Sequence, residues 1–316
     1  MNGSVTKIID YSKIRDMNID SITFLKWIEE SILLKSSSDL PAKISMTLPD
    51  NGFFNVMPCA MPSLGCMGVK IINRYPGRVP SLDSQIFLYD YLTGNLEAVI
   101  DGNYITAMRT GAVAAHSINL LAKRGFKTIG LIGLGNTAYA TVDILIALFK
   151  DRNIEIKLFK YKGQEKAFME RYSDKNVRFT LHDSHNELMR DTDVVLSCVT
   201  YTNNDFCTED AFKDGCTVVP VHTKGFMCCD TTFDKVFTDD TSHVAKFQNF
   251  DKFKNLNEVA SVVEGKCPGR ENDSERILVY NTGVGVHDIF FAKKIFDTIE
   301  PSGSFDTKPP KKKHWV

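Results

Sequence analysis

The most informative stretch of this sequence is Lys127-Thr-Ile-Gly-Leu-Ile-Gly-Leu-Gly-Asn-Thr-Ala-Tyr-Ala-Thr-Val-Asp-Ile-Leu-Ile-Ala-Leu-Phe-Lys150. It predicts a buried strand, a glycine turn and a helix. Residues 128–132 form a short apolar run, which is typical of a parallel strand covered on both faces. Residues 139–149 form an amphipathic run of helical length. The order strand, turn, helix predicts the start of a βαβ unit.

The turn between them fits the dinucleotide-binding pattern G-x-G-x-x-G/A. Gly133 can make the tight turn, Gly135 leaves room for a pyrophosphate, and Ala138 lets the helix lie close to the strand. Free N–H groups at the helix start, which includes Asn136 and Thr137, would face the phosphates. The same pattern also occurs in ordinary turns, but the flanking strand and helix favour a dinucleotide site.

The end of the next strand bears on the choice of dinucleotide. NAD-binding folds usually place Asp or Glu there to bind the ribose hydroxyls. This chain has Leu-Phe-Lys-Tyr-Lys-Gly-Gln at residues 158–164, with Lys160 and Lys162 and no carboxylate. Two cations suit a 2′-phosphate, so we favour NADP(H) over NAD(H). The alternative is that both lysines are solvated residues at a strand end.

The pattern on either side of the glycine turn predicts two kinds of sheet. After the turn, short apolar strands alternate with helices, which predicts a Rossmann-type parallel sheet. Before it, an amphipathic helix at residues 21–35 precedes five short strands separated by turn residues, which predicts an antiparallel sheet. The predicted class is α/β: a Rossmann-type parallel sheet domain plus a mixed α+β domain. Further predicted elements are helices at 104–121, 164–172, 186–191, 208–213 and 289–299, and strands at 43–48, 53–57, 66–73, 85–90, 96–100, 154–161, 178–182, 193–200, 216–221 and 277–281.

Composition excludes several classes of function. The 316 residues are 43% hydrophobic and 24% charged, with a formal charge of −1, which gives no electrostatic case for nucleic acid. No apolar run reaches the length of a membrane span, and residues 1–7 lack a signal-peptide core. The eight cysteines are scattered, as expected for reduced thiols, so we expect a cytoplasmic protein. We expect no metal site, because no C-x-x-C occurs and His182 and His185 fit a surface turn.

Four polar residues are candidates for a substrate site. Lys70 lies in an otherwise apolar strand, where it either snorkels to water or faces a substrate. Arg109 precedes a patch of small residues in a helix, and is either a surface charge or a fork for a carboxylate. His287 and Asp288 follow two glycines at a predicted helix start, where they either edge a site or act as an exposed side chain and a cap.

Several separated stretches together resemble the ornithine cyclodeaminase/mu-crystallin family of NAD(P)-binding oxidoreductases. They occur in the family's order and span most of the chain between residues 41 and 299. The matching stretches are Met57-Pro58, Gly68-Val-Lys70, Asp90-Tyr-Leu-Thr-Gly94, Thr106-Ala-Met-Arg-Thr-Gly-Ala112, Gly133-Leu-Gly135, Asp193-Val-Val-Leu-Ser-Cys-Val-Thr200, Val263-Glu-Gly265-Lys-Cys-Pro-Gly-Arg270 and Gly283-Val-Gly-Val-His-Asp288.

The resemblance implies two domains and a homodimer. Residues 1–117 with 284–316 would bind substrate and dimerise, and residues 118–283 would bind the dinucleotide. Lys70 and Arg109 match the family's substrate-site cations, and Lys43 replaces an Arg that is common in the family. The remaining positions implied to contact the dinucleotide are Arg109, Thr110, Thr200, Val221 and Asp288.

One departure from the family pattern narrows the expected reaction. Lys224 stands where cyclodeaminases carry a catalytic Asp, while Asp230 matches an acidic residue slightly later. We therefore expect an NAD(P)H-dependent oxidoreductase that acts on the C–N bond of an amino-acid-like substrate with a carboxylate. Lys224 would lie beside the imine, and His222, His287 or Asp288 would supply a proton. The alternatives are an ornithine or lysine cyclodeaminase and a non-enzymatic NADPH-binding protein of the mu-crystallin type.

Overall fold

The computed structural model describes residues 4–307, which divide into two compact units. Unit 1 comprises the chain up to Asp20, Glu30–Arg109 and the chain from Val284 onward, and unit 2 comprises Ser21–Glu29 and Thr110–Gly283. The substrate-binding and dinucleotide-binding roles of the two domains stay predictions. Within the described residues, none of the helices combines the length and apolar composition that a bilayer crossing requires.

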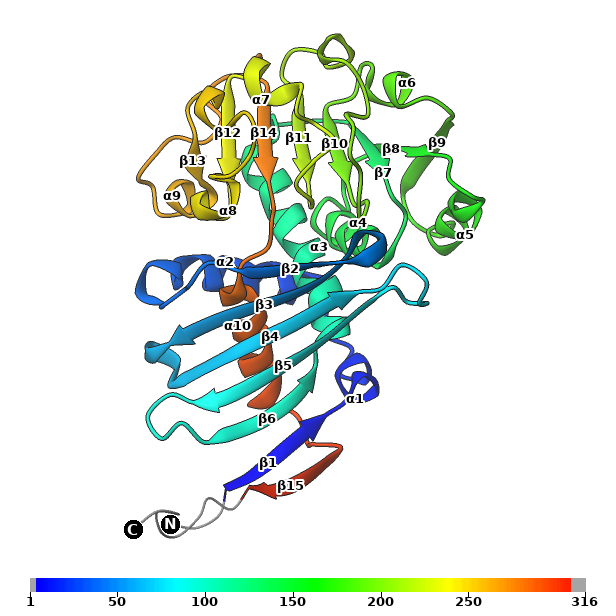
Figure 1. The fold of residues 1–316 in the computed structure, drawn as a ribbon. Helices are drawn as coiled ribbons and strands as arrows, with labels where there is room; N and C mark the ends of the chain where they lie inside the picture. The colour runs from blue at the N-terminus through cyan, green and yellow to red at the C-terminus, as the bar shows by residue number, and fades with distance from the viewer. Residues whose placement is uncertain (1–3, 308–316) are drawn as a thin grey trace. The chain divides into compact units, whose positions relative to one another are not determined.

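Unit 1 contains a seven-stranded mixed sheet with the order β15-β1-β6-β5-β4-β3-β2 (Figure 1). Strands β2 to β6 form an antiparallel meander, β1 pairs in parallel with β6, and β15 pairs antiparallel to β1. The strand bounds are β1 Ser4–Ile9, β2 Ile44–Leu48, β3 Gly52–Met61, β4 Cys66–Arg74, β5 Leu82–Asp90, β6 Leu96–Asp101 and β15 Gly303–Thr307.

Helix α10, Gly285–Phe296, packs on β3, β4 and β5 of this sheet. It begins four residues before the predicted start at residue 289, so the predicted start of this helix was wrong. A Cβ at Gly285 would lie 2.9 Å from the carbonyl oxygen of Pro58 in β3. The missing side chain therefore lets the helix start close against the sheet, and it brings His287 and Asp288 into the first turn.

Unit 2 contains an eight-stranded parallel sheet with the order β13-β12-β14-β11-β10-β7-β8-β9 (Figure 1). This is the predicted Rossmann-type sheet. The strand bounds are β7 Thr128–Ile132, β8 Ile154–Phe159, β9 Val177–His182, β10 Val194–Ser197, β11 Thr217–Pro220, β12 Lys235–Thr238, β13 Asn257–Glu258 and β14 Ile277–Tyr280.

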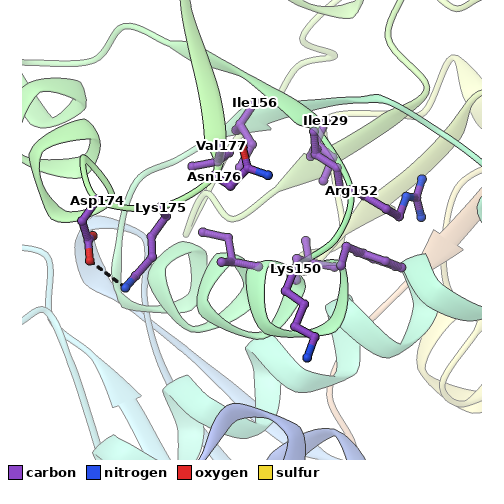
Figure 2. Close-up of a pocket in the computed structure, with 12 residues that line it drawn as sticks. Ile129, Lys150, Arg152, Ile156, Asp174, Lys175, Asn176 and Val177 are labelled. Atoms are coloured by element: carbon purple, nitrogen blue, oxygen red, sulfur yellow. Dashed lines mark hydrogen bonds and ion pairs between the residues drawn. The ribbon is translucent and has the colours of Figure 1, made fainter.

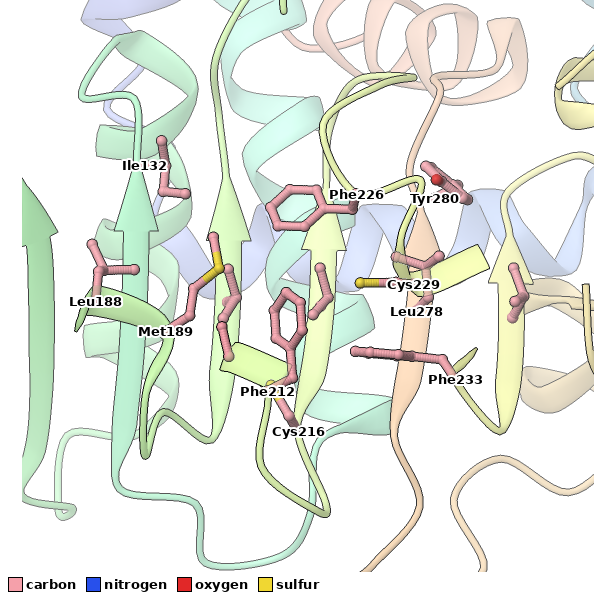
Figure 3. Packing of buried hydrophobic residues seen from close by; sticks show 14 of the residues in the cluster. Ile132, Leu188, Met189, Phe212, Cys216, Phe226, Cys229, Phe233, Leu278 and Tyr280 are labelled. Atoms are coloured by element: carbon pink, nitrogen blue, oxygen red, sulfur yellow. The ribbon is translucent and has the colours of Figure 1, made fainter. Parts of the chain in front are cut away.

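The core of unit 2 explains why its central strands are mostly apolar. All four residues of β10, β11 and β14 are buried, as expected where both faces of a parallel sheet are covered. Figure 3 shows part of this core, in which Phe212, Phe226 and Phe233 surround Cys229 and Leu278. The predicted helix at residues 208–213 is only a single 3₁₀ turn, η4, Glu209–Ala211.

The remaining helices connect the strands. The unit boundary falls inside α3, between Arg109 and Thr110. The bounds are α1 Tyr11–Asp16, α2 Ser21–Leu33, α3 Gly102–Leu121, α4 Asn136–Leu148, α5 Gln164–Arg171, α6 His185–Met189, α7 Cys229–Thr232, α8 Thr241–Val244 and α9 Val259–Val263, with 3₁₀ turns η1 Lys35–Ser37, η2 Pro49–Asn51, η3 Pro62–Leu64 and η5 Phe250–Lys252.

Candidate active site

Three of the predicted site residues form a buried ion-pair cluster in unit 1. Asp288 Oδ1 accepts hydrogen bonds from Lys70 Nζ at 2.7 Å and from Arg109 Nε at 2.9 Å. Lys70 and Asp288 are fully buried, and Arg109 is 5% exposed. Strand β4 supplies Lys70, helix α3 supplies Arg109, and the first turn of α10 supplies Asp288. The surface readings of both cations are therefore wrong, because both side chains are buried.

The cluster carries two potential positive charges and one negative charge. Burial, together with the charge of Arg109, lowers the pKa of Lys70 to about 7, while Asp288 opposes the shift. Burial alone would raise the pKa of Asp288, but Arg109 and Lys70 outweigh it and hold that pKa below its ordinary value. The lowered pKa favours the ionised carboxylate of Asp288, which accepts hydrogen bonds and counts against a role as proton donor.

One atom of the cluster has no partner in the structure. Asp288 Oδ2 is buried and accepts no hydrogen bond from residues 4–307. A buried carboxylate oxygen without a donor is costly, so this atom indicates a bound N–H or O–H group. The site thus has more cations than carboxylates, which suits a bound carboxylate. It also has one carboxylate oxygen that can accept a hydrogen bond from a bound donor group.

His287 and Lys43 lie near this cluster in unit 1. His287 is 3% exposed, and its Nδ1 lies 2.7 Å from Ser31 Oγ in α2. The reading of His287 as an exposed side chain is therefore wrong. Lys43 is half-buried, and its charge contributes to the lowered pKa of Lys70. Ser31 was not predicted, and no local motif could have revealed it, because it lies 256 residues from His287 in the sequence.

The glycine turn of unit 2, which was predicted to bind the dinucleotide, makes a tight bend and has open space beside Gly135. Gly133 has φ +83°, and a Cβ there would lie 2.8 Å from the backbone of Cys198 and Val199. Gly135 is the N-cap of α4, gives it no side-chain cap, and has nothing within 4 Å of the position of a Cβ. Gly135 and Asn136 are exposed and Thr137 is half-buried, so the first N–H groups of α4 are open to a phosphate, whereas Ala138 is buried.

The two lysines after β8 have different surroundings. Lys160 Nζ pairs with Asp183 Oδ2 at 2.7 Å, and both side chains are substantially exposed. Lys162 has φ +53°, and its Nζ lies 5.0 Å from the ring centre of Tyr161. Asp183 was not considered in the sequence. Its position directly after β9, the neighbour of β8, is the signal that could have identified this pairing.

The loop after β11 carries the residue that departs from the family pattern. Lys224 is exposed, and Val221 and His222 are half-buried; Thr200, after β10, is exposed. Ser197 Oγ lies 2.6 Å from His222 Nε2, and burial lowers the pKa of His222 to about 4. A pKa that low counts against His222 as the residue that supplies the proton.

Asp230 is held by hydrogen bonds within unit 2. Tyr280 OH donates to its Oδ1 at 2.7 Å, and Asn249 Nδ2 donates to its Oδ2 at 3.2 Å. Burial raises the pKa of this carboxyl group to about 6. These bonds tie α7 to β14, so we assign Asp230 to the stability of unit 2.

A cavity of about 190 Å³ in unit 2 is a weaker candidate (Figure 2). Ile129, Ile154 and Val177 place it at the amino ends of β7, β8 and β9. Ligands of open parallel sheets bind at the carboxyl ends.

Among the described residues, no group of three His, Cys, Asp or Glu side chains is arranged to hold a metal ion.

The sequence model of the ornithine cyclodeaminase/mu-crystallin family matches residues 12–303. The chain belongs to this family. The match includes both the Lys70–Asp288–Arg109 cluster and the glycine turn of unit 2.

Related members of the family carry names that describe C–N chemistry. The chain is 27% identical to N-((2S)-2-amino-2-carboxyethyl)-L-glutamate dehydrogenase of Staphylococcus aureus, over 78% of this chain and 80% of that protein. It is 24% identical to a Delta(1)-pyrroline-2-carboxylate reductase of Bacillus thuringiensis, over 78% and 82%. The Thermococcus litoralis Delta(1)-pyrroline-2-carboxylate reductase, solved with NADH and L-proline, shares the fold, with a TM-score of 0.82 and 21% identity over 92% and 97%.

Proposed function

We propose that this protein is an NAD(P)H-dependent reductase of C=N bonds in small imino acids, or that it runs the reverse oxidation. The buried Lys70–Asp288–Arg109 cluster carries this proposal. Two cations around one carboxylate suit a substrate that has both a carboxylate and an N–H group. The names of the related reductase and dehydrogenase describe substrates of that kind.

In unit 1, Arg109 and Asp288 would bind the substrate, and Lys70 would transfer the proton. Arg109 uses Nε to hold Asp288, so its two terminal nitrogens remain for a bidentate grip on the substrate carboxylate. Asp288 Oδ2 would accept the N–H of an iminium group. Lys70, with a pKa of about 7, can hold a proton at Nζ and release it near neutral pH.

The residues at the glycine turn would hold the dinucleotide, which supplies the hydride when bound. The start of α4, from Asn136 to Ala138, would face the pyrophosphate, and Gly135 gives it room. Burial of Lys70 and Asp288 keeps bulk water from the reacting carbon, which protects an imine from hydrolysis. Lys224, exposed in the loop after β11, would interact with the nitrogen substituent.

The proposal is tested by following NADPH absorbance with Δ1-pyrroline-2-carboxylate and with linear imines formed from a 2-oxo acid and methylamine. We expect turnover, and we expect Arg109→Ala to raise KM for the acid far more than for the corresponding amide. Lys13→Ala, at an exposed position in α1, is the matched control. Release of ammonia from ornithine without a reductant would instead identify a cyclodeaminase. Absence of turnover together with tight NADPH binding would identify a binding protein.

We further propose that NADP(H) is preferred over NAD(H). Lys160 and Lys162 follow β8, where the ribose of a bound dinucleotide would lie. The exposed ion pair of Lys160 with Asp183 contributes little stability, so a 2′-phosphate can replace the carboxylate. Lys162→Ala should weaken NADPH binding and leave NADH binding unchanged in calorimetry.

We also propose a cytoplasmic homodimer. All eight cysteines are free, as in a reducing compartment. Ile44 and Met46 are 59% and 48% exposed on the edge strand β2, a position where apolar side chains usually mark an interface. Ile44→Lys should shift the sedimentation coefficient from that of a dimer to that of a monomer, and an unchanged value would contradict this assignment.

A further inference from the structure

Three thiols gather in unit 2 between the loop after β10 and the loop after β11. Cys207 lies in the first loop, and Cys228 and Cys229 lie at the end of the second. Cys207 and Cys228 meet through the backbone of one and the side chain of the other. Cys228 Sγ lies 3.6 Å from the carbonyl oxygen of Cys207 and 3.9 Å from Cys229 Sγ.

The two loops are held together by contacts of neighbouring residues. Asp205 accepts the N–H groups of Met227 at 2.5 Å and of Cys228 at 3.0 Å through its two carboxylate oxygens. Phe206 N–H donates to the carbonyl oxygen of Gly225 at 3.0 Å. The backbones that carry Cys207 and Cys228 are thus fixed side by side. A disulfide between them requires the two side chains to rotate so that their sulfur atoms reach bonding distance.

The three thiols differ in access and in charge. Cys229 is fully buried and lies among Phe226, Phe233 and Leu278 in the core (Figure 3), and burial raises its pKa. Cys207 and Cys228 are both half-buried. The neighbouring Cys207 thiol lowers the pKa of Cys228, Cys228 in turn raises that of Cys207, and the nearby Asp205 opposes ionisation of both. Cys228 is therefore the nucleophile of the pair, since the thiolate is the reactive form.

We propose that Cys207 and Cys228 form a redox-active dithiol whose oxidant is a small disulfide such as glutathione disulfide. The Cys228 thiolate attacks one sulfur of that disulfide, which forms a mixed disulfide and releases one glutathione thiolate. The sulfur of Cys207 then attacks Cys228 Sγ, which forms the internal disulfide and releases the second glutathione with the proton of Cys207. Two protein thiols are oxidised, and one external disulfide is reduced to two thiols.

The internal disulfide would tie the loop of His222 and Lys224 to the loop after β10. Gly225, which has φ +110° and a Cβ position only 2.6 Å from Phe206, lies at the point where the loops meet. A covalent bond three residues from Gly225 and one residue from Phe206 would restrict the movement of Lys224. The proposal does not depend on the identity of the substrate, and it can be tested without measuring activity.

The test is incubation of the full chain in glutathione buffers of increasing oxidised fraction, followed by alkylation of free thiols and peptide mass mapping. We expect a Cys207–Cys228 cross-link that dithiothreitol reverses. Cys207→Ser should instead retain a glutathione adduct on Cys228, because the resolving thiol is gone. Cys267→Ser, at another half-buried cysteine, is the matched control and should still form the cross-link.

Three outcomes would overturn the proposal. They are a stable glutathione adduct on Cys228 in the unaltered chain, a cross-link between Cys228 and Cys229, and full alkylation of Cys207 and Cys228 at every buffer ratio. If Cys207→Ser does not fold, Cys207→Ala serves the same purpose, because it also removes the resolving thiol.

Discussion

Replacement of Lys70 by Met tests the electrostatics of the buried cluster, because it removes the ammonium group and keeps an unbranched side chain. The pKa of Lys70 falls from 10.5 to about 7 in the folded chain, mainly through burial. Between these two values, the unfolded chain binds a proton that the folded chain has released. The free energy of unfolding therefore rises with pH, by at most about 1.4 kcal/mol per pH unit and about 5 kcal/mol in total.

The assay is urea unfolding of the unaltered chain and of Lys70→Met, followed by circular dichroism at several pH values from about 7.5 to about 9.5. All other titrating groups are common to both proteins, so the difference between them isolates Lys70. Over that range, we expect the free energy of unfolding of the unaltered chain to rise by about 2–3 kcal/mol more than that of Lys70→Met. Lys13→Met, at an exposed position in α1, is the control. Its free energy of unfolding should vary with pH as that of the unaltered chain does.

Parallel pH profiles for Lys70→Met and the unaltered chain would refute this reasoning. They would mean that Lys70 has the same pKa in the folded and unfolded chains. The charge balance assigned to the cluster, and the role of Lys70 as a proton donor, would then both be wrong.

Two further predictions concern unit 2. Burial raises the pKa of Asp230 from 3.8 to about 6, so the free energy of unfolding should fall by up to about 3 kcal/mol as pH rises through that range. Asp230→Asn should lose this fall in urea titrations at matched pH, and a fall that persists would assign it to another group. Gly135→Val should keep the melting temperature, because its Cβ meets open space, but should weaken NADPH binding at least about tenfold in calorimetry. Gly133→Ala should lower the melting temperature, because its φ is +83° and its Cβ would meet Cys198; the opposite pattern for the two glycines would contradict the assigned turn.

Local sequence patterns were sufficient to predict the centre of unit 2. The strand predicted at residues 128–132 is β7, Thr128–Ile132, because a buried parallel strand needs an uninterrupted apolar run. The start of α10 was missed, since Gly285 resembles a turn residue. A side chain at Gly285 would be too close to the carbonyl oxygen of Pro58 on a distant strand, and no local pattern reveals that contact.

Strands β1 and β15 were missed for a related reason. Val5 and Ile8 are exposed in β1, so the strand lacks the buried alternation that predicts a strand. Its pairing with β6 and β15 joins segments from both ends of the chain. The candidate cations Lys70 and Arg109 could be named from the sequence and the family resemblance. Their shared bond to Asp288 could not, because it spans 218 and 179 residues.

That shared bond also fixes the order in which the site can assemble on the ribosome. Lys70 and Arg109 are synthesised early, but their counter-ion follows Arg109 by 179 residues. At about 5–20 residues per second, the nascent chain carries both cations for about 10–35 s before Asp288 is made. Burial of the two cations without their carboxylate would be unfavourable during that interval. Translation must therefore reach the first turn of α10 before unit 1 can close, so premature termination upstream of Gly285 leaves a product that cannot complete this unit.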